Sequence, residues 1–356
     1  MRNAEAFSPD WASAPGDTMS DILRERNISA DDFAQRIGHT NKETSELLRG
    51  RVPITIALAR RLEKVLGGSV EFWMSRDFQY RQQVAKPDLV ENVWLKDLPV
   101  ADMVRFGWLR PQPRASEQLT ACLSFFGVPN VAAWHRVYGP LQQEFAFRKS
   151  PSFEPRPAAV CAWLRQGELQ AQEIMCAPWD AQSFEEALPS IRSLTREKDP
   201  KRFMPTLQRV CAKSGVAVVI VRSPTGCHAS GATRFVASDK ALLLLSVRHL
   251  SEDQFWFSFF HEAGHLLLHS HREVFIEGLE GPKPAAESEA NEFASRVLIP
   301  PEHRPDLLRL RQNAFELARF ARRIGVSPGI VVGQLQHYGR VKKNHFNGLR
   351  RRYRWE

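Results

Sequence analysis

An apolar stretch in the second half of the chain restricts the fold more than any other feature. Residues 255–271 read FWFSFFHEAGHLLLHSH, and a helix of this sequence is apolar around most of its circumference, which is typical of a buried helix. Its middle nevertheless carries His261, Glu262 and His265. Ionisable side chains in an apolar environment are costly unless they have partners. The sequence therefore predicts a specific role for these three groups.

The three groups have the His-Glu-x-x-His spacing of a zinc site. Residues four apart lie on one face of a helix, so His261 and His265 can both reach one Zn²⁺. Glu262 lies about 100° around the helix from His261, where it can act on a water molecule beside the metal. Ser251 and Gln254 have the spacing of a capping box, which predicts where this helix begins.

A catalytic zinc site requires a third protein ligand and leaves its fourth position for water. After Pro284 the sequence becomes helical, and Glu287 and Asn291 are four residues apart. This spacing allows Glu287 to bind the metal while Asn291 orients a ligating histidine. Glu289 points to roughly the opposite side of the helix and is the alternative ligand. We expect Glu287 to be the third ligand.

The sequence leaves alternative roles open for four other polar residues. His269 continues the histidine spacing, where it either caps or packs the helix end or touches the ligand shell. His228, His303 and Tyr338 are candidate donors to an oxyanion, and the sequence does not choose among them.

These motifs resemble a known family. FHEAGHLLLH followed by ESEANEFASRVLIP is similar to the ImmA/IrrE metallo-endopeptidases, and the likeness extends from GVAVVIV to IGVSPGIVVGQLQ. The resemblance implies a gluzincin-like fold, peptide hydrolysis, zinc bound by His261, His265 and Glu287, and Glu262 as the base. The strand-like runs 215–221, 231–236 and 241–247 precede the metal helix, so we expect an α+β domain with a small sheet.

The N-terminal part reads as a series of short helices. Ser29 with Asp32 and Thr40 with Glu43 have capping-box spacing, and Gly38 ends the helix between them. Two helices joined by so tight a turn predict a helix-turn-helix.

Residues 15–80 resemble the Xre-type helix-turn-helix of antitoxins in the HigA group. The resemblance implies that residues 41–51 form the recognition helix and its exit. Residues 1–88 contain 13 basic and 13 acidic residues, so a protein-docking role for this segment is the alternative to DNA binding. The expected groove contacts are Asn41, Lys42, Thr44, Ser45 and Arg49, and the expected phosphate contacts are Arg36 and Arg51.

Chain length, hydrophobic content and charge distribution indicate how the chain is divided into domains. At 356 residues and 43% hydrophobic content, the chain is long enough for several packed cores. The net charge of +9 is concentrated at the C-terminus, where residues 304–356 contain 13 basic and three acidic residues. We expect an all-α helix-turn-helix DNA-binding domain at 1–88, a helical middle region at 89–200, a metallopeptidase domain at 201–340 and a basic tail at 341–356.

The sequence also indicates a cellular setting. No apolar run reaches the roughly 18 residues of a spanning helix, and the first residues lack a signal-peptide pattern, so we expect a cytoplasmic protein without membrane contact. The five cysteines are spaced as reduced structural thiols. The leading interpretation is a zinc endopeptidase that cleaves a repressor or antitoxin and is tethered to a DNA-binding domain. The alternative is a transcriptional regulator or antitoxin whose zinc domain does not cleave, and either protein can be a homodimer.

Overall fold

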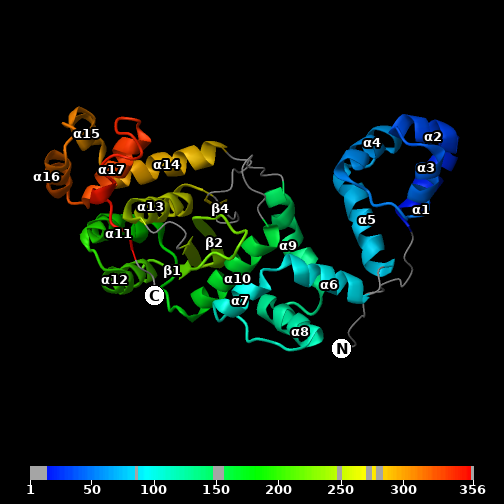
Figure 1. Ribbon diagram of the computed structural model, residues 1–356, viewed down its shortest axis with the longest axis horizontal. Coiled ribbons are helices and arrows are strands. Elements are labelled where there is room, and N and C mark those ends of the chain that lie inside the picture. The colour runs from blue at the N-terminus through cyan, green and yellow to red at the C-terminus, as the bar shows by residue number, and fades with distance from the viewer. Residues whose placement is uncertain are drawn as a thin grey trace. The chain divides into compact units, whose positions relative to one another are not determined.

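The chain forms two compact units, Met1–Trp94 and Leu95–Glu356. The computed structural model describes residues 14–84, 87–146, 156–246, 251–269, 275–277 and 284–353 (Figure 1). Among the helices in these ranges, none has both the length and the apolar character that crossing a membrane requires.

The first unit is all-helical. Gly38 adopts a left-handed conformation with φ of 68° and separates the second helix from the third. Ser29 accepts a hydrogen bond from the Asp32 amide, and Thr40 and Glu43 cap each other reciprocally, which confirms both predicted helix starts. The helices are α1 (Pro15–Glu25), α2 (Ala30–Ile37), α3 (Asn41–Leu48), α4 (Ile56–Leu66), α5 (Val70–Val84) and α6 (Pro87–Asp97), which crosses into the second unit.

A four-stranded mixed sheet lies at the centre of the second unit. Its order is β1-β3-β2-β4, with β1 parallel to β3 and β2 antiparallel to both β3 and β4. The three predicted strands are confirmed as β1 (Val216–Val221), β2 (Gly231–Ala237) and β3 (Lys240–Ser246). The edge strand β4 (Phe275–Ile276) was not predicted, because two residues carry no detectable alternation.

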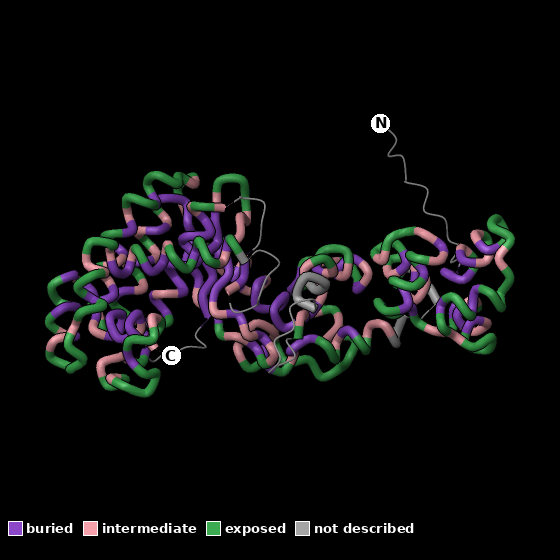
Figure 2. Tube along the Cα trace, turned by 90° about the horizontal axis from the view of Figure 1, so that it is seen from above, coloured by how far each residue is buried: buried purple, intermediate pink, exposed green. Residues whose placement is uncertain are grey.

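Helices cover both faces of this sheet (Figures 1 and 2). On one face, α10 packs its buried Trp163 against the strands, and the Trp163 indole donates to the Val221 carbonyl at 3.1 Å. On the other face, α13 (Glu252–Leu268) contributes Phe255, Trp256 and Phe259 to a larger core. The helices before β1 are α7 (Val100–Arg105), α8 (Ala115–Phe126), α9 (Val131–Ala146), α10 (Pro157–Glu173), α11 (Ala181–Ser193) and α12 (Pro200–Ala212).

The middle region therefore shares a core with the sheet. No local sequence pattern predicts this shared core, because the contact between α10 and the sheet is made by residues more than 50 positions apart. The remaining helices are α14 (Pro284–Leu298), α15 (Arg304–Arg309), α16 (Ala314–Ile324) and α17 (Pro328–His337).

The expected basic tail is packed over residues 341–353. Arg350 forms a two-point ion pair with Asp253 at 2.9 Å for each contact. Tyr353 is 2% exposed, and its hydroxyl accepts a hydrogen bond from the Trp256 indole at 2.9 Å. These contacts hold the segment against the start of α13, so at least one of its charges serves the fold.

Candidate metal centre

The helix that carries the His-Glu-x-x-His motif is buried along most of its length. His261, Glu262 and His265 are 1%, 0% and 2% exposed, as the apolar flanks predict. The predicted capping box at the start of α13 is wrong. Ser251 is the N-cap, but the Ser251 hydroxyl donates to the Asp253 carboxylate and accepts no hydrogen bond from a backbone amide. Asp253 competes for the serine because it lies only two residues further on.

Helix α14 lies beside α13 and brings a carboxylate to the two histidines (Figure 1). Nε2 of His261 lies 3.2 Å from one Glu287 oxygen, and Nε2 of His265 lies 3.6 Å from the other. The two Nε2 atoms are 3.0 Å apart. Among the described residues, these three form the one group of His, Cys, Asp and Glu side chains close enough to hold a metal ion.

Both histidines are oriented through their other ring nitrogen. Nδ1 of His261 lies 3.0 Å from Oδ1 of Asn291, so a proton on Nδ1 leaves Nε2 directed at Glu287. Nδ1 of His265 lies 3.1 Å from Nδ1 of His269, whose Nε2 lies 3.0 Å from Glu289. Glu289 therefore does not belong to the group of His261, His265 and Glu287, and His269 links Glu289 to His265.

Glu262 lies beside the sheet and against its second strand. Oε2 accepts a hydrogen bond from Thr233 of β2 at 3.1 Å, while Oε1 is buried and has no hydrogen-bond partner among the described residues. A side chain at Gly231 would place its Cβ 2.6 Å from Oε1. Glycine at this position therefore leaves the space beside the carboxylate open.

Burial and mutual charge shift the protonation of this cluster. Burial raises the pKa of Glu262 well above its ordinary value, against the opposing effect of His261. Burial alone lowers the pKa of His261, but the hydrogen bond to Glu287 and the charges of Glu262 and Glu277 outweigh it and raise that pKa to about 9. Burial, with the charges of His261 and His269, lowers the pKa of His265 to about 2.

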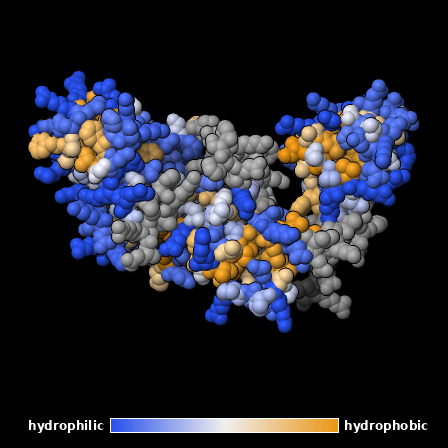
Figure 3. Space-filling model, viewed as in Figure 1, coloured by the Kyte–Doolittle hydropathy of each residue, from blue (hydrophilic) through white to orange (hydrophobic). Residues whose placement is uncertain are grey.

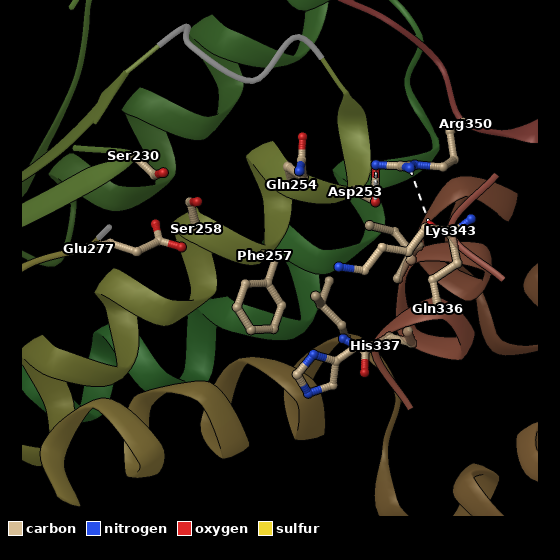
Figure 4. Close-up of a pocket in the computed structure, with 14 residues that line it drawn as sticks. Ser230, Asp253, Gln254, Phe257, Ser258, Glu277, Gln336, His337, Lys343 and Arg350 are labelled. Carbon is tan, nitrogen blue, oxygen red and sulfur yellow. Dashed lines mark hydrogen bonds and ion pairs between the residues drawn. The ribbon is translucent and has the colours of Figure 1, made fainter. Parts of the chain in front are cut away.

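Two residues near the site were not found from the sequence. Thr233 belongs to no motif, and only the pairing of β2 with β3 and β4 directs it at Glu262. Glu277 directly follows β4, and its carboxylate faces Ser258 of α13 (Figure 4). Burial raises the pKa of Glu277, and the charge of His261 opposes that shift.

A pocket of about 400 Å³ extends from this part of α13 toward α17 and the C-terminal segment (Figure 4). Ser230, Ser258 and Glu277 line one end, and Lys343 and Arg350 line the other, as the close-up shows. Phe257 lies between the two ends. The Phe257 ring centroid is 6.3 Å from that of His261, so the pocket lies next to this histidine of the candidate metal site.

The other candidate donors do not form a defined set. The Tyr338 hydroxyl accepts a hydrogen bond from Arg304 at 2.7 Å, and its assignment as an oxyanion donor stays a prediction. The assignments of His228 and His303 remain predictions.

In the first unit, most of the predicted DNA contacts are at the surface. Ser45 is half-buried, whereas Thr44 is 2% exposed, so the predicted groove contact by Thr44 is wrong. Thr44 lies on the same face of α3 as Leu47, which is part of the core. Glu46 pairs with both Arg49 and Arg51 at 3.3 Å. The predicted contacts that are exposed are Arg36, Asn41, Lys42, Arg49 and Arg51.

Comparisons with known proteins show similarities in both parts of the chain. A stretch of 61 residues is 33% identical to an uncharacterized HTH-type transcriptional regulator of Escherichia coli K12, YddM, and this similarity lies in the N-terminal region. It covers 17% of this chain and 65% of that regulator. Residues 214–335 match the family of the IrrE N-terminal-like domain, Peptidase_M78. The second unit therefore contains an IrrE N-terminal-like domain of a metallopeptidase family, joined to a region similar to an HTH-type transcriptional regulator.

Proposed function

We propose that this chain is a zinc-dependent endopeptidase of the gluzincin type, coupled to a helix-turn-helix unit that binds DNA. The observation that carries the proposal is the convergence of His261, His265 and Glu287, with the buried Glu262 beside them. The Peptidase_M78 match over residues 214–335 supports the same reaction class.

The donor atoms suit zinc. A tetrahedral site with bonds of about 2.1 Å has ligand atoms about 3.4 Å apart. Here the two Nε2 atoms are 3.0 Å apart, and they lie 3.2 and 3.6 Å from the two oxygens of Glu287. Three protein ligands leave one position for water or substrate, which is the arrangement of catalytic zinc sites. When bound, zinc supplies Lewis-acid chemistry that polarises a peptide carbonyl and activates water.

The protein's own groups provide the proton transfer. We assign Glu262 as the general base, which takes a proton from the attacking water on Oε1 and passes it to the departing amine. Thr233 holds Oε2, so the free oxygen is the one beside the open space at Gly231. The raised pKa of Glu262 favours this role, because a carboxylate with a higher proton affinity is a stronger base.

We propose that the first unit binds DNA. We further propose that the substrate is a protein regulator such as a repressor or antitoxin. The similarity to an HTH-type transcriptional regulator supports the first assignment. Tethering would raise the local concentration of the peptidase near a DNA-bound substrate. Figure 3 shows apolar side chains at the surface over α4 and α5, where Ile56, Phe72 and Phe78 are exposed, and a homodimer would cover them.

Cleavage of mixed peptide libraries by the zinc-loaded chain, read by mass spectrometry, tests the proposed activity. We expect zinc-dependent cleavage that is lost in Glu262→Gln, while this variant still binds zinc and melts at the wild-type temperature. Equal cleavage by wild type and Glu262→Gln would contradict the proposal. Zinc binding without cleavage of any library member would favour a regulator whose zinc domain is a sensor.

The DNA assignment has a separate test in the salt dependence of binding. We expect the affinity of the full chain for duplex DNA to fall steeply with salt, and Lys42→Ala to weaken it. Affinity that is absent or independent of salt would favour protein docking by this unit.

A further inference from the structure

The pocket in Figure 4 contains a carboxylate that the proposed reaction does not use. Glu277 lines the pocket, and the close-up shows its carboxylate directed toward Ser258 and Phe257. Oε2 is sealed from solvent and has no hydrogen-bond partner among the described residues, although the residue as a whole is half-buried. A buried carboxylate oxygen without a donor is costly, so this position favours a ligand that brings N–H groups.

The same carboxylate lies next to the metal group. Glu277 follows β4 directly, and Phe275 of that strand stacks on His265 with ring centroids 4.2 Å apart. Ser258, which this carboxylate faces in Figure 4, is one turn before His261 on α13. A peptide bound at the metal would therefore place one of its side chains near this end of the pocket.

The charges of the pocket distinguish Glu277 from the other acid that lines it. Asp253 is neutralised by the two-point ion pair with Arg350. Lys343 is exposed and lies at the opposite end from Glu277 (Figure 4). The end near the metal is therefore acidic, and no lysine or arginine among the described residues pairs with its carboxylate.

We propose that Glu277 and the pocket beside it bind a basic side chain of the peptide substrate, with arginine preferred over lysine. A volume of about 400 Å³ holds such a side chain with room to spare. Arginine presents paired N–H donors in one plane, which suits a carboxylate better than the point charge of lysine. The last torsion of a glutamate is soft, so either oxygen can turn to meet the guanidinium.

The inference rests on the proposed peptidase function only in taking the ligand to be a peptide. Its test measures binding and needs no cleavage. The probes are N-acetylarginine hydroxamate and malonyl-hydroxamate arginine amide, which place the guanidinium on opposite sides of the zinc-binding group. Each is compared with its citrulline counterpart, which has nearly the same shape and no charge. Calorimetric titrations use the zinc-loaded full chain.

We expect at least one arginine probe to bind about tenfold more tightly than its citrulline counterpart, the size expected of a charge-assisted hydrogen bond. Glu277→Gln should abolish this preference by weakening the arginine probe alone, with citrulline binding unchanged. Lys343→Gln is the matched control, because it removes a charge from the far end of the same pocket, and it should keep the preference.

Three results would overturn the inference. These are equal affinities for arginine and citrulline in both probe pairs, a preference that survives Glu277→Gln, and failure of every probe to bind the zinc-loaded chain. The proposed function fails in a different way. In that case the arginine preference is present and depends on Glu277, but no peptide is cleaved.

Discussion

Two clusters of ionisable groups lie on the same buried helix, α13, and they differ in how their charges are met. At the start of the helix, Glu252 and Asp253 face Arg351 and Arg350 of the C-terminal segment, at 3.5 Å and 2.9 Å. In the middle, no described arginine or lysine pairs with Glu262, and the two histidines face Glu287. The acidic charges of the first cluster are paired with arginines of the same chain. The second cluster leaves donor atoms available for a ligand.

This difference separates a structural cluster from a functional one. Acidic residues at a helix start are favoured by the helix dipole, and the arginines complete their pairing. Histidines with converging Nε2 atoms face no arginine and have the arrangement that we propose binds a cation. The comparison predicts that substitutions in the first cluster change stability and that substitutions in the second change chemistry.

The largest effect is expected from Glu262→Gln. The amide keeps the shape of the side chain and cannot accept the proton of water, so kcat should fall by about 10²- to 10⁴-fold. Rate measurements on a peptide identified from the library, together with zinc analysis and melting temperature, provide the check. If zinc content or the melting temperature also collapsed, Glu262 would belong with the structural cluster.

Arg350→Ala should affect stability instead. Removing one partner leaves Asp253 largely buried and unpaired, which should lower the free energy of unfolding by about 3 kcal/mol. Arg311→Ala, a change at an exposed arginine, is the control and should cost less than about 0.5 kcal/mol. Denaturant titration of the zinc-loaded chain measures both. Equal stability of these two variants would show that the C-terminal segment does not hold α13.

Zinc affinity should depend on pH through His261. The pKa of this histidine in the metal-free chain is raised to about 9, so below that pH a proton must leave before zinc binds. Affinity should therefore fall about tenfold for each pH unit below 9. The pKa of His265 is lowered to about 2, so it should add no further dependence. Competition with a chelator of known protonation measures this, and a flat profile from pH 7 to 9 would contradict the assigned charges.

The features of the candidate site that depend on local spacing could be predicted from the sequence. The spacing of the motif and of Glu287 and Asn291 requires only helix geometry, and the structure brings all of these side chains together. The second unit matches the Peptidase_M78 family, to which the motifs pointed. The starts of α2 and α3 likewise depend on residues three apart.

The sequence missed what depends on distant pairing. Thr233 and Glu277 reach the site through the register of β2 with its neighbours, and no local pattern shows that register. Arg350 looked like part of a basic tail because its partner Asp253 is 97 residues away. The resemblance to a recognition helix implies a groove contact for Thr44, but this residue lies on the face of α3 that packs into the core.

Thr233→Val should produce the smallest of these effects. The variant keeps the shape of the side chain and removes the donor to Oε2 of Glu262, so kcat should fall about tenfold, equivalent to one hydrogen bond. Thr233→Ser keeps the hydroxyl and should retain most of the activity. Identical rates for the valine and serine variants would show that the hydrogen bond does not position Glu262.

Zinc stoichiometry tests the distinction between the two clusters most directly. Elemental analysis would compare the wild type with His265→Ala, Glu287→Ala and Glu289→Ala, each checked for folding by circular dichroism. We predict one zinc per chain in the wild type and in Glu289→Ala, and loss of zinc in His265→Ala and Glu287→Ala. A wild-type chain that takes up no zinc, or a Glu287→Ala variant that retains it, would contradict the assignment of this cluster as a metal site.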